Sequence, residues 1–120
     1  MSQGAVIRNL EWTLLMVQQP TRQRSPAGVL VLDPTSDELH VRLVPELKGA
    51  DPELGEFWRE LQGYLSQRSR ELGGTRTLEW LETVASHIVQ LSARIPIATA
   101  NAEEALQTLY RNYVAHDAGA

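Results

Sequence analysis

Three histidines, His40, His87 and His116, are the side chains of this 120-residue sequence best suited to acid–base chemistry, because their ordinary pKa lies near neutrality. None of them has a second ligand at metal-binding spacing, and the chain contains no cysteine. His40 and Arg42 share one face of an alternating stretch, where they form either a small anion-binding ledge or part of a solvated sheet face. His87 either faces an interface or is satisfied by a backbone carbonyl. We therefore expect no catalytic or metal-binding histidine.

Paired carboxylates are the second group that could carry acid–base or metal chemistry. Exposed acidic faces are common on helices, and acidic residues in a first helical turn are favoured by the helix dipole alone. The sequence also has no phosphate-binding glycine loop and no nucleophile elbow. We expect no cofactor, and we interpret the pairs as surface charge: Glu56 and Glu60, Glu79 and Glu82, and Glu103 and Glu104.

The segment QQPTRQRSP contains two arginines, Arg22 and Arg24, which are the best candidates for contact with an anionic partner. A guanidinium group can form bidentate hydrogen bonds with a phosphate or carboxylate. If nucleic acid were bound, these arginines and Arg42 should converge on one surface. The net charge of −4 argues against that partner.

The three tryptophans, Trp12, Trp58 and Trp80, have the size of core residues. Trp80 lies off the apolar stripe that Leu78 and Leu81 define in a helix. It therefore either packs on a second neighbour or marks a protein-binding patch, and we name Trp80 and His87 as candidate interface residues.

Length and composition predict one domain over residues 1–120, with flexible ends at 1–8 and 116–120. The absence of cysteine suits a reducing compartment. The first residues lack the pattern of a secretory signal, and no apolar run is long enough to cross a bilayer. We therefore expect a cytoplasmic protein with no membrane contact.

The elements that position these residues follow from periodicity and from turn residues. Alternating or uninterrupted apolar runs predict strands at residues 9–17, 27–33, 39–43 and 95–99, the second of them buried on nearly both faces. The turn at residues 33–37 joins two of them into a hairpin. In the third strand, residues 39, 41 and 43 should face the helices, leaving His40 and Arg42 on the more polar face.

Three helices are expected. Asp51 and Pro52 begin one that ends near Gly73, and Asn101 caps the last one. The stretch LEWLETVASHIVQLSARIP, residues 78–96, predicts a core helix capped by Thr75 or Thr77 and stopped by Pro96. Its residues 88–92 fit either a helix or a strand.

Together these elements predict an α+β domain in which an antiparallel sheet of three to four strands carries about three helices on one face. The segments VLVLDP, LHVRL, FWRELQGYL and ALQTLYRNYV resemble small uncharacterised bacterial proteins of the family catalogued as domain of unknown function 3037. That resemblance spans nearly the whole chain and implies no catalytic residue.

The favoured function is a non-enzymatic interaction or regulatory module that binds protein, either itself or another chain. One alternative is nucleic-acid or anion binding through the arginine-bearing loop. The other is a small enzyme, which requires His40 or His87 beside a carboxylate in a concave pocket.

Overall fold

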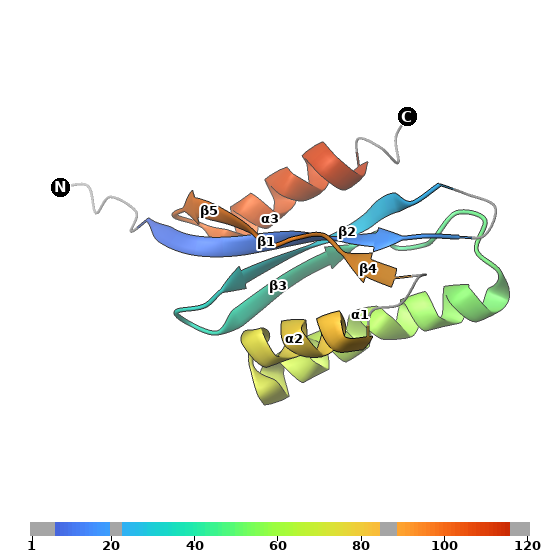
Figure 1. The fold of residues 1–120 in the computed structure, drawn as a ribbon, viewed down its shortest axis with the longest axis horizontal. Coiled ribbons are helices and arrows are strands. Elements are labelled where there is room, and N and C mark those ends of the chain that lie inside the picture. Colours follow the sequence, from blue (N-terminus) through green and yellow to red (C-terminus); the bar gives the residue numbers. More distant parts are fainter. Residues whose placement is uncertain (1–6, 20–22, 85–88, 116–120) are drawn as a thin grey trace.

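The computed structural model describes residues 7–19, 23–84 and 89–115, which form strands, α-helices and one π-helical turn (Figure 1). The elements are β1 (Arg8–Val17), β2 (Ser25–Asp33), β3 (Glu38–Leu43), α1 (Pro52–Leu72), α2 (Gly74–Val84), β4 (Val89–Leu91), β5 (Ile95–Thr99), α3 (Ala102–Tyr110) and η1 (Arg111–Ala115).

The sheet is antiparallel with the order β3-β2-β1-β4, and β5 pairs with β1 as well. Strand β1 is long enough to pair with both β4 and β5 along the same edge. Strand β5 pairs with its first half and β4 with its second half. Between the two short strands, Ser92 continues the pairing, since its Oγ accepts the Leu14 N–H (2.9 Å) and its carbonyl accepts the Thr13 hydroxyl (2.7 Å). One edge of the sheet is therefore made of two short pieces.

Helices cover both faces of this sheet (Figure 1). The reason lies in β2, where every residue from Ala27 to Asp33 is buried, so that neither face of the strand can be left to water. On one face Trp58, Leu61 and Leu65 of α1 pack with Leu78 and Leu81 of α2. On the other face, α3 and η1 cover apolar side chains of β1 and β2, namely Leu10, Trp12, Val29 and Val31. The covering side chains are Leu106, Leu109, Tyr110 and Val114.

The predicted α+β class is confirmed, with an antiparallel sheet and three α-helices in the described residues. Two details differ. The sheet has five strands because the end of the stretch 78–96 joins it, and α3 lies on the face opposite to α1 and α2.

Helix α1 begins and ends as the sequence predicts. The Asp51 carboxylate accepts the Leu54 N–H (2.8 Å), and Pro52 occupies the first turn. Gly63 lies inside the helix without ending it, and the helix stops at Gly73, whose φ of 86° favours glycine.

The stretch 78–96 is not one helix, so that prediction is wrong. Helix α2 begins at Gly74 and is described to Val84, while Val89–Leu91 is a strand. The ambiguity over residues 88–92 is therefore settled in favour of a strand for residues 89–91, and residue 88 lies outside the described residues. Neither threonine caps the helix with its side chain. Instead, the Asp37 carboxylate of the β2–β3 turn accepts the Thr75 N–H (2.7 Å), and the Asp37 carbonyl accepts the Gly74 N–H (2.7 Å).

Among the helices of the described ranges, none combines the length and the apolar character required to cross a bilayer.

Candidate functional site

His40 and Arg42 both point toward α3, so the face predicted to be polar and open is in fact covered by a helix. His40 Nδ1 lies 3.3 Å from Glu103 Oε2 at the start of α3. The Arg42 guanidinium carbon lies 4.1 Å from the centre of the Tyr110 ring, in a cation–π contact. Both side chains therefore connect β3 to α3, and the predicted anion-binding ledge is occupied by residues of the chain itself.

The His40–Glu103 pair has the residue types that an acid–base pair requires. However, the Glu103 side chain is 62% exposed, so water screens its charge. A pocket of the described residues, at the entry to α1, is lined by neither residue. In this structure the pair ties β3 to α3.

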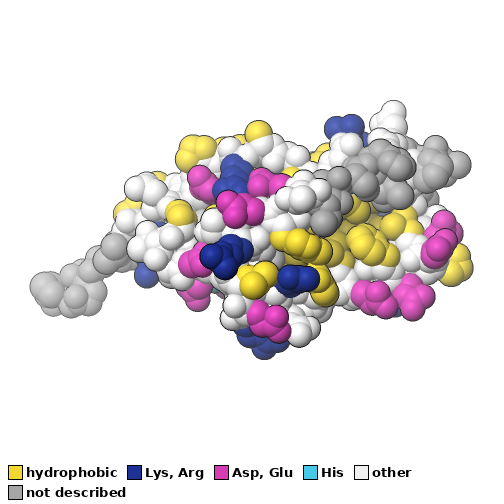
Figure 2. Space-filling view, turned by 60° about the horizontal axis from the view of Figure 1, so that its bottom comes forward, with side chains coloured by type: hydrophobic (Ala, Val, Ile, Leu, Met, Phe, Trp, Pro, Cys, Tyr) yellow, Lys and Arg dark blue, Asp and Glu magenta, His cyan; other side chains and the backbone are white. Residues whose placement is uncertain are grey.

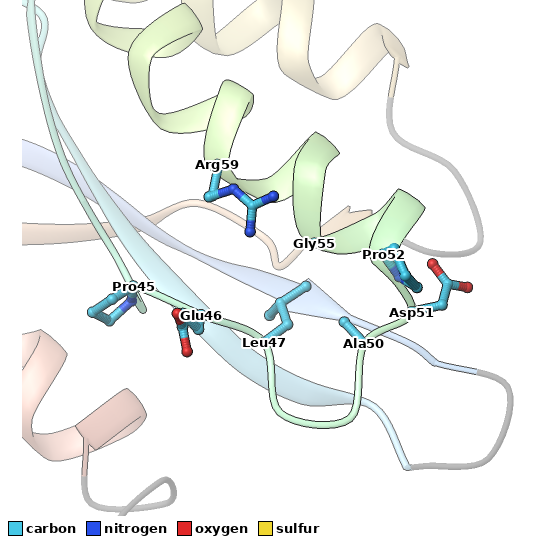
Figure 3. A pocket seen from close by; sticks show the side chains of 8 residues that line it. All are labelled: Pro45, Glu46, Leu47, Ala50, Asp51, Pro52, Gly55 and Arg59. Atoms are coloured by element: carbon cyan, nitrogen blue, oxygen red, sulfur yellow. The ribbon is translucent and has the colours of Figure 1, made fainter.

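One pocket of the described residues lies where the chain leaves β3 and enters α1, and its volume is about 380 Å³ (Figure 3). Arg59 projects from α1 beside Gly55, across from Glu46 of the loop, and Asp51 lies at the rim with its carboxylate engaged in the helix cap. One basic and two acidic side chains thus line the same hollow. Their mixed charge does not select an anion or a cation.

Trp80 packs against α1 through Tyr64 and Arg68. Of the two alternatives given for its position off the apolar stripe, the second neighbour is therefore present. The Tyr64 and Trp80 ring centres lie 5.0 Å apart with the planes tilted by 44°. The Arg68 guanidinium carbon lies 4.7 Å from the Tyr64 ring centre and 5.2 Å from that of Trp80. Arg68 also donates a hydrogen bond to the Tyr64 hydroxyl. We refer to these three side chains as the Tyr64–Arg68–Trp80 cluster.

This cluster lies at the surface. Tyr64 is 38% exposed, and Arg68 and Trp80 are half-buried, with Trp80 in contact with the core between the sheet and α1. Phe57, seven residues before Tyr64 on the same side of α1, is 45% exposed. Figure 2 shows hydrophobic side chains gathered on the side of the molecule that carries α1 and α2, with acidic and basic groups around them.

Of the three arginines named in the sequence, the two that the structure describes lie apart. Arg22 lies outside the described residues. Arg24 is exposed just before β2, whereas Arg42 pairs with Val29, and four residues of strand separate Val29 from Ser25, about 13 Å. The expectation for a nucleic-acid surface is not met by the two that the structure describes.

Arg94 forms the most connected ion pair of the described residues. Its guanidinium donates to both Glu82 carboxylate oxygens (2.9 and 3.2 Å) and to Glu11 (3.3 Å). These hydrogen bonds, chiefly the one to Glu82, raise the pKa of Arg94 against the opposing effect of partial burial. The network joins α2 to β1 beside the break between β4 and β5, so Glu82 has a structural role and does not pair with Glu79.

In the described ranges, no three His, Asp or Glu side chains lie close enough together to hold a metal ion. His87 and His116 lie outside those ranges, so the interface role predicted for His87 is not addressed.

Comparison with family models, with curated proteins and with solved structures gives no match for this chain. The resemblance to the domain of unknown function 3037 stays a prediction. The site is therefore defined by its geometry alone.

Sequence reasoning named Trp80 but missed Tyr64 and Arg68. A signal was present, because Tyr64 and Arg68 are four residues apart and lie beside, not on, the stripe of Trp58, Leu61 and Leu65. What the sequence could not provide is the crossing of α1 and α2 that brings Trp80 to them.

Proposed function

We propose that this chain is a non-enzymatic protein-interaction module whose binding surface is the Tyr64–Arg68–Trp80 cluster together with Phe57. The observation that carries the proposal is the combination of a tryptophan, a tyrosine and an arginine in mutual contact at the surface. These three residue types dominate the binding energy of protein interfaces.

The arrangement of the cluster supports this role. Each of its side chains is held by the other two, and Trp80 is also anchored in the core. Side chains that are already ordered lose little rotamer freedom when a partner binds, so more of the contact energy appears as affinity. A flexible surface arginine lacks this advantage.

The partner we propose is a segment of another protein that carries an apolar side chain next to an aspartate or glutamate. The exposed rings of Phe57 and Tyr64 provide apolar contact area. Arg68 adds a positive charge beside the rings of Tyr64 and Trp80, where a carboxylate can accept hydrogen bonds from its guanidinium. An apolar and acidic segment therefore matches both features of the surface.

Selection from a random peptide library displayed on phage tests this proposal. We expect the purified full chain to enrich peptides in which acidic residues neighbour large apolar ones. Binding of the enriched peptides should be lost in the Arg68→Glu and Tyr64→Ala variants.

Two matched controls separate the cluster from general surface effects. Arg59→Glu makes the same charge change on α1 outside the cluster, and Tyr113→Ala removes another exposed tyrosine, which contacts Trp12 near α3. Both controls should bind as the original chain does. A selection without enrichment, or peptides that bind Arg68→Glu unchanged, would overturn the proposal.

The setting we propose is the cytoplasm of a bacterium, since a chain without cysteine suits a reducing compartment and the family it resembles is bacterial.

A further inference from the structure

The two edges of the sheet differ in how well they resist the addition of another strand. On the β4–β5 side, the edge consists of pieces of three and five residues, separated at residues 92–94, and Pro96 lies within β5. Short strands, interruptions and prolines are the features that prevent edge-to-edge pairing. This edge is protected.

The β3 edge has none of these features. It runs without interruption for six residues, contains no proline, and keeps a regular register with β2 from Gly28 to Asp33. The helices lie against the two faces of the sheet (Figure 1). The outer side of β3 therefore has the form of a strand that can accept a further strand.

The hydrogen-bonding phase of β3 shows which of its backbone groups point outward. Val44 N–H donates to Ala27 O (2.8 Å), and in an antiparallel ladder every second residue bonds the neighbouring strand. The even-numbered residues of β3 therefore bond β2, and Leu39, Val41 and Leu43 direct their N–H and C=O groups away from it. Within the described part of the chain, no hydrogen bond joins these outward groups to another element.

The first half of this edge is the less buried one, although Gly74 at the start of α2 lies close to the Glu38–Leu39 peptide on the side of the sheet that carries α1 and α2. Leu39 and Val41 are half-buried and Glu38 is exposed, whereas Leu43 is buried. A strand that pairs here must therefore use the outward groups of Leu39 and Val41.

We propose that β3 pairs with β3 of a second copy of this chain, in an antiparallel register centred on His40. This interaction lies on a different surface from the Tyr64–Arg68–Trp80 cluster and does not depend on the function proposed for it. In this register Leu39 of each copy faces Val41 of the other, and the two pairs exchange about four backbone hydrogen bonds.

Charge complementarity identifies the second copy as the occupant. In the same register, Glu38 of each copy lies directly opposite Arg42 of the other, so that opposite charges meet twice across the symmetry axis. Both side chains are exposed in the single chain. The two His40 side chains face each other at the axis, and each lies beside the Glu103 carboxylate of its own chain.

The neighbouring register is less suitable. A register centred on Val41 would place Arg42 opposite His40 and would require the buried Leu43 to pair. It brings no opposite charges together. The register centred on His40 is therefore the one that the edge favours.

Sedimentation velocity over about 10 µM to 1 mM protein tests the proposal. An interface of two short paired strands is small and should give weak, reversible dimers. Glu38→Arg should weaken dimerisation by about tenfold, since it places arginine opposite arginine twice. The double variant Glu38→Arg/Arg42→Glu restores opposite charges and should recover the dimer. A chain that stays monomeric over the whole range, or a double variant that fails to recover, would overturn the proposal.

A second pair of variants tests the backbone bonds directly. Val41→Pro removes an N–H that points away from β2, so it should abolish the dimer while leaving the ladder with β2 intact. Val41→Thr keeps this N–H and a β-branched side chain, and should dimerise as the original chain does. Circular dichroism checks that both variants are folded. Dimerisation that persists in the folded Val41→Pro variant, or that is lost in Arg68→Glu, would refute pairing through this edge.

Discussion

Replacing Asp33 by alanine should destabilise the protein by about 3 kcal/mol, because this buried carboxylate holds the turn that carries β3. Asp33 is 1% exposed at the end of β2, and its carboxylate accepts hydrogen bonds from Arg8 (2.6 Å) and from the Thr35 N–H (3.0 Å). A longer contact comes from the Ser36 N–H (3.4 Å). The side chain therefore joins the start of β1 to the β2–β3 turn.

The magnitude follows from these contacts. A hydrogen bond to a charged group contributes about 1.5 to 3 kcal/mol, and the lower value applies because Arg8 is 52% exposed. The bond from Thr35 adds about 1 kcal/mol, and the long contact from Ser36 adds little. Asp33→Asn keeps an oxygen for the Thr35 N–H, so it should cost only about half as much as Asp33→Ala.

The pH dependence of stability gives the same residue a second readout. Burial acts to raise the pKa of Asp33, but the hydrogen bonds from Arg8, Ser36 and Thr35 outweigh it and hold the pKa below its ordinary value of 3.8. Because the folded-state pKa is the lower one, this contribution is fully present above about pH 3.8 and is lost as the pH falls below it. Asp33→Asn should remove this part of the acid destabilisation.

Urea unfolding followed by tryptophan fluorescence provides the assay, with Arg8→Met and the double variant Arg8→Met/Asp33→Asn completing a thermodynamic cycle. We expect a coupling free energy of about 1 kcal/mol between the two positions. Zero coupling, or a cost below about 1 kcal/mol for Asp33→Ala, would refute the assignment of Asp33 as the anchor of the turn.

Gly73 combines a φ of 86° with a site where an added Cβ would lie 2.0 Å from an Asp37 carboxylate oxygen, so Gly73→Ala should cost about 2 kcal/mol or more in urea unfolding. Gly63 lies inside α1 with no atom within 4 Å of such a Cβ, so Gly63→Ala should instead stabilise by about 0.5 to 1 kcal/mol, and equal effects at both sites would contradict this difference. Arg94→Met should cost about 1 kcal/mol by removing the pairs with Glu82 and Glu11, and a difference from the original chain that does not shrink in high salt would show that ion pairing is not the cause.

Local signals in the sequence predicted the elements that depend on neighbouring residues. Asp51 and Asn101 cap their helices as expected, because a cap is satisfied within three residues. The hairpin of β2 and β3 was predicted correctly for the same reason. The apolar run of β2 indicated burial on both faces, which already implies cover on both faces of the sheet, but the prediction placed all three helices on one side.

Long-range contacts account for the predictions that were wrong. Asp37 caps α2 from a turn nearly forty residues earlier in the chain, and no spacing rule connects the two. The stretch 78–96 has helical periodicity at its start, but its end becomes strands because β1 offers an unpaired side along its whole length. A short apolar run such as Val89–Leu91 takes its conformation from such a neighbour and not from its own period.

For the candidate site too, local sequence signals predicted some features, and long-range packing determines the others. The size and position of Trp80 predicted either a second neighbour or a protein-binding patch, whereas the identity of Tyr64 and Arg68 as its neighbours depends on the packing of α1 against α2. His40 and Arg42 were placed on the correct face of β3, but the helix that covers them could not be inferred from their spacing.

The affinity of one selected peptide for the original chain and two charge variants is the most direct measurement of the central claim. Fluorescence anisotropy of the labelled peptide should give a Kd that rises about 30-fold in Arg68→Glu. This is the change expected when reversing the charge of an interface arginine costs about 2 kcal/mol of binding free energy. The same charge change at Arg59, outside the cluster, should alter the Kd by less than about threefold. Equal Kd values for Arg68→Glu and Arg59→Glu would contradict the assignment of the Tyr64–Arg68–Trp80 cluster as the binding surface.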